Sequence, residues 1–153
     1  MQERIALIAA DRWVEDDQGE RVFQVDEMAM AKLNAFILRD LHGVEVAKLR
    51  HADLEKEHAT DIMREGRRLA TVRRARAGLR HHYVIEAADD GSLEVHGQVG
   101  RYEYEIQRDG DVVAVVSKKW FSAHDAYGVE VVVGEDEAMI VAAAVAIETM
   151  HIG

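Results

Sequence analysis

The sequence contains no cysteine and no proline among its 153 residues. Without cysteine the chain can form no disulfide, thiolate metal site or cysteine nucleophile. Without proline, every residue can donate a backbone hydrogen bond to a β-ladder, which permits long uninterrupted sheets. Serine is also scarce, and Ser92, Ser117 and Ser122 lack the glycine pattern of a nucleophile elbow. These absences exclude a disulfide scaffold and remove the usual starting points for nucleophilic catalysis.

Long apolar runs are almost absent as well. The longest, Ala138 to Ile147, falls short of the roughly 18 apolar residues that span a membrane. We therefore expect no transmembrane segment, and the first residues show no signal-peptide pattern. The expected location is cytoplasmic, with at most peripheral contact to membranes. As a helix, this run has no polar face and needs protein on all sides.

Short glycine-centred turns recur before alternating apolar stretches, at residues 17–23, 41–47, 64–70 and 108–114, with a further turn at Asp90-Gly91. Glycine in such turns supplies positive φ, and Asp-Gly is a strong hairpin signal. The pattern predicts a mostly β chain built as an antiparallel meander. A long sheet leaves exposed edges unless it closes, so we expect a closed barrel around the C-terminal hydrophobic helix. The pattern alone also allows the helix to pack on an open sheet or on a partner.

The chain is acidic, with a net charge of −10, which disfavours nucleic acid and anionic lipid as bulk partners. One segment departs from this balance. Between Met63 and His82 there are seven arginines and one acidic residue, Glu65, and we call this segment the arginine island. The segment lacks the aromatic residues on which the bases of a single-stranded nucleic acid would stack. Two interpretations remain open: a solvated face, or an anion site that binds a lipid head group or an acidic partner. The candidate site residues are Arg64, Arg67, Arg68, Arg73, Arg74 and Arg76, with Lys118 and Lys119 as further contributors; Arg80 is the last arginine of the island.

Histidines and carboxylates give no catalytic or metal pattern. His81 and His82 are adjacent, so on a strand their side chains diverge. His51 and His58 are not spaced as in a metalloprotease helix. The clustered acidic residues come just before glycine turns or before the predicted helix. Backbone hydrogen bonding in the turns and the helix dipole are sufficient reasons for them. We expect no metal, no cofactor and no catalytic residue.

The C-terminal half carries a family resemblance. The stretch 117–131, from Ser117 through Trp120-Phe121 and Asp125 to Tyr127-Gly128, and the stretch 135–142 resemble the LURP-one-related (LOR) family. Residues 19–25 and 38–40 resemble its opening hairpins. The resemblance covers nearly the whole chain and is more distant to the tubby C-terminal domain and the phospholipid scramblases. It implies a single domain over residues 1–153 with about twelve strands around the helix.

The resemblance supplies no catalytic residue, but tubby-like relatives bind phosphoinositides through basic side chains. It therefore implies a non-enzymatic barrel that binds an anionic lipid head group or a protein partner. A scaffolding module, with dispersed arginines paired to acids, is the alternative; a small-molecule carrier or enzyme would need an unfilled lumen. We assign the family-motif residues to structure, because adjacent strand residues face opposite sides and an aspartate before a turn bonds backbone amides. They are Trp120, Phe121, Asp125, Tyr127 and Gly128. His124 and Ala126 replace the arginine and threonine common in the family.

Overall fold

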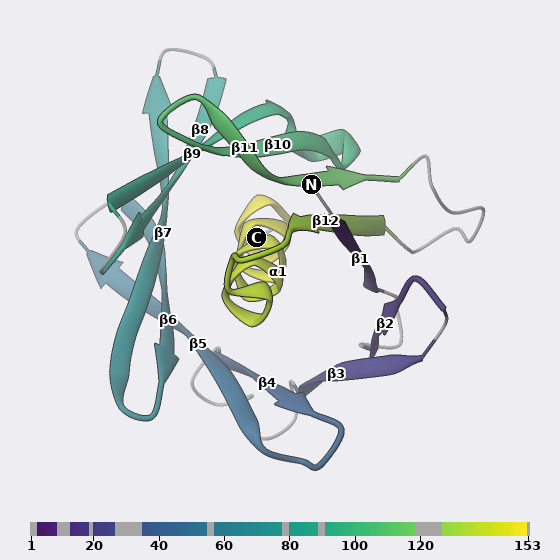
Figure 1. Cartoon of the computed structure of the whole chain (residues 1–153). Helices are drawn as coiled ribbons and strands as arrows, with labels where there is room; N and C mark the ends of the chain where they lie inside the picture. Colours follow the sequence, from purple (N-terminus) through teal and green to yellow (C-terminus); the bar gives the residue numbers. More distant parts are fainter. Residues whose placement is uncertain are drawn as a thin grey trace.

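The computed structural model shows a ring of strands with one helix inside it (Figure 1). It describes residues 3–8, 13–18, 20–26, 35–54, 57–77, 80–88, 91–118 and 127–152. Within these residues the strands are β1 Glu3–Ile8, β2 Trp13–Asp16, β3 Arg21–Asp26, β4 Ala35–Asp40, β5 Glu45–Leu54, β6 Glu57–Arg64, β7 Arg67–Ala77, β8 Arg80–Ala87, β9 Gly91–Gln98, β10 Glu103–Arg108, β11 Asp111–Ser117 and β12 Tyr127–Val132. A 3-10 helix, η2, covers Val99–Arg101, and the helix α1 covers Glu137–Ile152.

Each strand pairs antiparallel with its neighbours in sequence, and the ladder returns to its start as a closed barrel. The closing strand is β1, in which Leu7 lies opposite Glu15 of β2 and opposite Gly128 of β12. Closure gives each of the described strands a hydrogen-bonded neighbour on both sides. The prediction of a mostly β chain with a C-terminal hydrophobic helix is confirmed.

The tight turns lie where the glycine pattern predicts them. In the β6–β7 turn, Glu65 and Gly66 have φ of 52° and 77°, and in the β10–β11 turn Asp109 and Gly110 have 52° and 86°. Two successive residues with positive φ are typical of the two-residue hairpin turns that match strand twist. The predicted turns at Gly19 and Asp90-Gly91 each include a residue outside those the structure describes.

The helix α1 fills the barrel. Its residues from Ile140 to Ile147 are at most 1% exposed, as the absence of a polar face requires. It packs most closely against β5, β6, β7 and β12. Inward side chains of the strands, such as Ile62, Val72 and Ile85, complete the core. Among the helical residues that the structure describes, none forms a segment long and apolar enough to span a bilayer.

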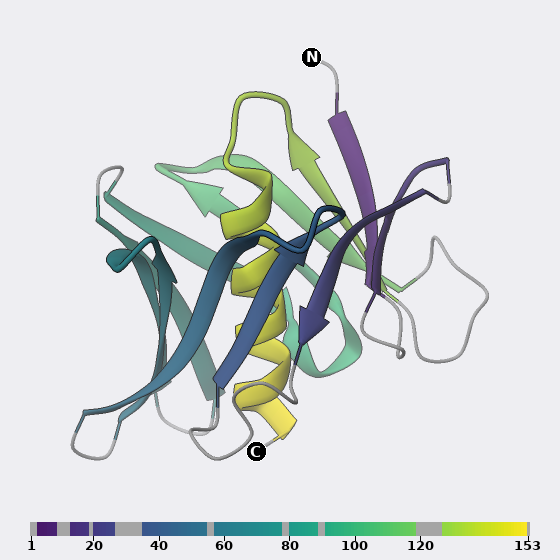
Figure 2. The ribbon, with the colours of Figure 1, turned by 90° about the horizontal axis from the view of Figure 1, so that it is seen from below.

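The two ends of the barrel differ in what they carry. Because neighbouring strands run in opposite directions, the β2–β3, β4–β5, β6–β7 and β10–β11 turns all lie at the end where α1 begins, which we call the helix-start end. The β7–β8 and β9–β10 connections lie at the opposite, helix-finish end. Figure 2 shows α1 running between these ends from the turn that follows β12.

One residue departs from a regular strand alternation. Tyr102, Tyr104 and Ile106 alternate in the sequence with Glu103 and Glu105, as residues on one face of a strand do, and Tyr104 and Ile106 are buried in β10. Tyr102 instead ends the 3-10 helix with a φ of 54°. The short helix reverses the chain before the strand begins, so Tyr102 reaches the core from the barrel rim.

Candidate functional site

The arginine island does not form one surface. Its central strand, β7, begins at Arg67 and extends past Arg76, a distance of about 30 Å at roughly 3.3 Å per residue. Arg64, Arg67 and Arg68 therefore lie near the helix-start end. Arg74 and Arg76 lie toward the helix-finish end, where the backbone of Arg76 pairs with that of His81. The structure thus divides the candidate anion-binding residues between two ends of the barrel.

Arg64 joins three segments at the helix-start end. Its Nε donates to the carbonyl oxygen of Val46 at 2.7 Å, and its two terminal nitrogens donate to the Asp136 carboxylate at 2.8 and 3.0 Å. Asp136 also accepts the backbone N–H of Met139 at 3.1 Å, which makes it the cap of α1. The hydrogen bond to Asp136 raises the pKa of Arg64. Burial raises the pKa of Asp136, but its bonds to Arg64 and to the helix amides outweigh that effect and leave the pKa lowered.

Two more arginines bond to neighbours on the outer wall. Arg73 donates to Glu86 at 2.9 Å across the β7–β8 ladder. Arg68 donates to Thr71 at 2.9 Å, and Thr71 donates in turn to Asp61 at 2.7 Å. Arg67 is exposed beside the β6–β7 turn. The ion pair between Arg73 and Glu86 is what the solvated-face interpretation of the island predicts for the outer wall.

Arg74 acts on the helix itself. Its Nη1 donates to the carbonyl oxygen of Met150 at 2.7 Å, in the last turn of α1. An arginine at this place satisfies an otherwise unpaired helix carbonyl and favourably opposes the negative end of the helix dipole. Arg74 also lies against Tyr83, whose pKa is raised by burial despite that arginine. This arginine is built into the helix-finish end rather than displayed on it.

All four tyrosines of the chain gather around the same end of α1. The hydroxyl of Tyr127 donates to Glu148 at 2.9 Å, and that of Tyr102 donates to the same carboxylate at 3.4 Å. The rings of Tyr102 and Tyr127 stack with centroids 4.8 Å apart. Burial, followed by the Glu148 charge, raises the pKa of Tyr104 and of Tyr127 far above the ordinary tyrosine value. Sequence reasoning missed this cluster, although Glu148 following the apolar run was a signal for it.

The two candidate lysines and the family-motif residues lie in different places, and the structure describes only some of them. Lys118 is exposed, and its Nζ lies 5.2 Å from the centre of the Tyr102 ring. Tyr127 and Gly128 are buried at the start of β12, where Gly128 pairs with Ser117 and Leu7. The other motif residues and the second lysine lie outside the described residues: Lys119, Trp120, Phe121 and Asp125. The side chain of Arg76 is likewise outside the description.

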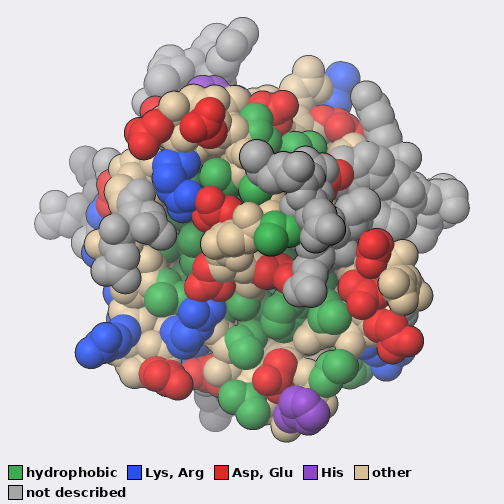
Figure 3. All heavy atoms as spheres, viewed as in Figure 1, with side chains coloured by type: hydrophobic (Ala, Val, Ile, Leu, Met, Phe, Trp, Pro, Cys, Tyr) green, Lys and Arg blue, Asp and Glu red, His purple; other side chains and the backbone are tan. Residues whose placement is uncertain are grey.

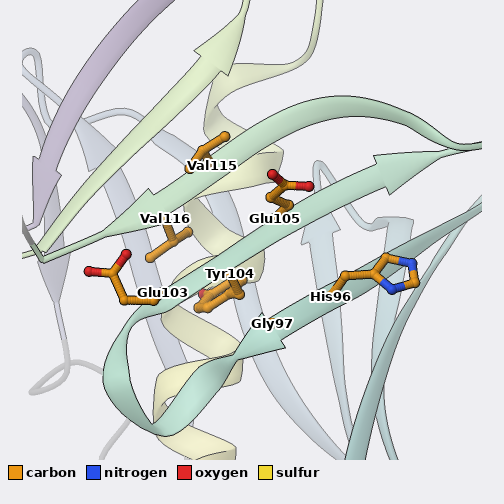
Figure 4. Close-up of a pocket in the computed structure, with 7 residues that line it drawn as sticks. All are labelled: His96, Gly97, Glu103, Tyr104, Glu105, Val115 and Val116. Carbon is orange, nitrogen blue, oxygen red and sulfur yellow. The ribbon is translucent and has the colours of Figure 1, made fainter.

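A hollow opens on the outer wall over β9, β10 and β11 (Figure 4). Its volume is about 390 Å³, and it is lined by His96, Gly97, Glu103, Tyr104, Glu105, Val115 and Val116. Glu105 stands between His96 and Val115 in the cross-strand register. The hollow therefore presents two carboxylates and an imidazole around a valine, on the outside of the barrel.

The polar groups of the hollow bond to close neighbours. Glu103 accepts the Ser117 hydroxyl at 3.0 Å, Glu105 accepts the Gln107 amide at 3.1 Å, and His96 lies 3.0 Å from Glu94. In the described part of the chain, no three His, Asp or Glu side chains gather closely enough to hold a metal ion. The two carboxylates of the hollow can attract a cationic group.

The comparisons with known proteins agree with this architecture. The model of the LURP-one-related family matches residues 1–148. An X-ray structure of a protein from Arabidopsis thaliana has a TM-score of 0.73 to this chain at 20% identity, covering 97% of this chain and 91% of the other. At that identity the likeness concerns the fold alone. No curated protein matches the chain significantly.

Proposed function

This chain belongs to the LURP-one-related family, and we propose that it is a non-enzymatic module that binds a protein partner through the outside of its barrel. The observation that carries the proposal is the filled interior. With α1 buried from Met139 to Ile147 and Tyr104 and Tyr127 closing one end, a ligand inside the barrel would have to displace core side chains. A carrier or enzyme built on the lumen is therefore disfavoured, and contacts fall to the outer surface.

The partners of the arginines also support a protein ligand. Arg64 and Arg73 are paired with Asp136 and Glu86, and Arg74 is committed to the helix carbonyl. Ion pairs of this kind weaken the case for an anion site that needs several unpaired arginines. The outer hollow and the acidic net charge favour a cationic surface on the partner.

A second candidate is the anionic lipid head group, and one observation favours it. Lys118 is exposed at the helix-finish end, the end at which β7 also places Arg76. Of these two residues, Lys118 has a described side chain, and its exposed ammonium group would supply positive charge to such a site. The net charge opposes it, since an anionic bilayer repels the molecule as a whole.

Two measurements separate these candidates. In the first, a photo-crosslinking amino acid is introduced at Leu41, at Val115 or at Lys118, so that both ends of the barrel and its outer wall are sampled. Proteins that crosslink in cells are then purified, and their binding to the wild type is measured by calorimetry. Sedimentation with phosphoinositide liposomes tests the lipid, using Arg76→Gln with Lys118→Gln and, as the charge-matched control, Lys48→Gln with Arg50→Gln. We expect a defined protein partner and no liposome binding. Salt-sensitive liposome binding lost only in the first variant, without a protein partner, would overturn the proposal.

A further inference from the structure

The helix-start end displays large apolar side chains at its turns. Among the residues that the structure describes, the exposed large hydrophobic side chains are Leu41, Val44, Val112 and Val133, and Leu41 and Val133 are 62% and 59% exposed. Leu41 and Val44 belong to the β4–β5 turn, Val112 is the second residue of β11, and Val133 follows β12. Single exposed apolar residues are ordinary, but here they mark three separate turns of one barrel end.

Both principal turns are held in fixed shapes. The Asp40 carboxylate accepts the backbone N–H groups of His42 at 2.8 Å and Val44 at 3.0 Å, which sets the geometry of the β4–β5 turn. The turn before α1 is fastened on two sides, since Arg64 bonds Asp136 and Arg108 pairs with Glu135. The apolar side chains are therefore presented on ordered loops, and binding would cost little loop entropy.

Acidic side chains surround these apolar positions. Carboxylates outnumber arginines in the turns of this end, and two of those arginines, Arg64 and Arg108, are already paired with acids. Figure 3 views the molecule from this end and shows hydrophobic side chains surfacing between charged ones. The acids of the turns are Asp16, Asp17, Glu20, Asp40, Glu45, Glu65, Asp109, Asp111, Glu135, Asp136 and Glu137.

We propose that the helix-start end is a docking surface for a cationic amphipathic segment of a partner protein. The apolar face of such a segment covers Leu41, Val44 and Val133, and its lysines or arginines meet the surrounding carboxylates. An anionic bilayer is repelled by these acids, and so is the same end of a second copy. The inference rests on the proposed function and names where the partner binds and its chemistry.

The test uses the full chain and a synthetic Leu/Lys amphipathic peptide of about 18 residues, long enough for several helical turns. A Leu/Glu peptide with the same apolar face controls for charge. Fluorescence anisotropy measures binding to the wild type, to the triple variant Leu41→Asn/Val44→Asn/Val133→Asn, and to Val84→Asn on the outer wall of β8, away from the hollow. All substituted positions are on the surface, and an unchanged urea midpoint confirms that each variant is folded.

We expect the Leu/Lys peptide to bind the wild type in a salt-sensitive manner, the triple variant to lose at least about tenfold in affinity, and Val84→Asn to bind as the wild type. Equal binding by the triple variant, equal binding of the Leu/Glu peptide, or no binding at all would overturn the proposal. So would sedimentation that shows self-association abolished by the triple variant. If crosslinks form at Val115 or Lys118 but not at Leu41, the protein-binding function is supported, but the helix-start end is not the docking surface.

Discussion

At the scale of single residues, Gly97 is a position that cannot accept a side chain without a steric clash. Its φ is 128°, and an added β-carbon would lie 2.6 Å from the carbonyl oxygen of Glu103 and 2.8 Å from the Cα of Tyr104. Both obstacles are backbone atoms of β10, which cannot move without breaking the ladder. We expect Gly97→Ala to lower the free energy of unfolding by about 3 kcal/mol or more, the sum of steric overlap and backbone strain. Urea unfolding followed by circular dichroism measures the loss.

Gly110 provides the matched control. Its φ is also positive, at 86°, but nothing lies within 4 Å of the position that a β-carbon would occupy. Gly110→Ala should therefore cost only the backbone term, about 1 kcal/mol. Equal losses for the two variants would show that the close approach of β10 at Gly97 has no energetic consequence.

Asp136 gives a residue-scale prediction in pH. Its folded pKa is depressed, so the charged carboxylate stabilises the fold above the ordinary carboxyl pKa, and this contribution is lost as pH falls through the folded value. Asn is also a good helix cap, so Asp136→Asn removes the charge and keeps the cap. We expect a loss of about 1 kcal/mol at neutral pH, modest because the pair with Arg64 is partly exposed.

The pH series supplies the test. Unfolding free energies of the wild type and Asp136→Asn should converge as the pH falls below the ordinary carboxyl pKa of 3.8 and then through the lower folded pKa, because the carboxylate is then protonated in both states. Arg64→Gln should reduce the same pH-dependent difference, because it removes the charged partner. A gap that stays constant across the series would mean that the cap, not the charge, is what Asp136 contributes.

At the scale of elements, local chemistry predicted the turns and the helix, and long-range placement explains what was missed. Aspartate tolerates positive φ and glycine, without a β-carbon, adopts it freely, so Asp109-Gly110 alone predicts the β10–β11 hairpin turn. The arginines of the island lie at opposite ends of the barrel because β7 is long, so that Arg64 bonds the N-terminal cap of α1 and Arg74 bonds its last turn. Arg64 meets Asp136 across 72 residues of chain, and no spacing rule in the sequence predicts that meeting.

The alanines of α1 carry an element-scale prediction. Ala143 is fully buried in the middle of the helix, where the barrel wall surrounds it. Ala143→Leu adds three carbons to a filled interior, so we expect a loss of about 1 to 3 kcal/mol in the free energy of unfolding. Ala138 is half-buried in the first turn, and Ala138→Leu should be nearly neutral. Equal effects at both positions would show that the lumen around the middle of α1 is not tightly packed.

At the scale of the whole molecule, charged residues and tyrosines are distributed between the two ends of the barrel, along the axis of α1. The acidic turns surround the positive end of the helix dipole, while Arg74 and the exposed Lys118 lie at its negative end. The sequence showed the acidic and basic segments, but only the closed topology places them at opposite ends. The same topology brings Tyr83, Tyr104 and Tyr127 from three strands to one end of α1.

This convergence predicts how the molecule responds to alkali. Burial raises the pKa of Tyr83, Tyr104 and Tyr127 in the folded state, so the unfolded chain releases these protons first, and stability must fall as pH rises above about 10. We expect tyrosinate absorbance from these residues to appear together with the loss of helical circular dichroism. Tyr104→Phe should remove one tyrosine's share of that amplitude. Complete ionisation of all four tyrosines with the circular dichroism unchanged would mean that water reaches the helix-finish end freely, contrary to the sealed interior on which the outer-surface function depends.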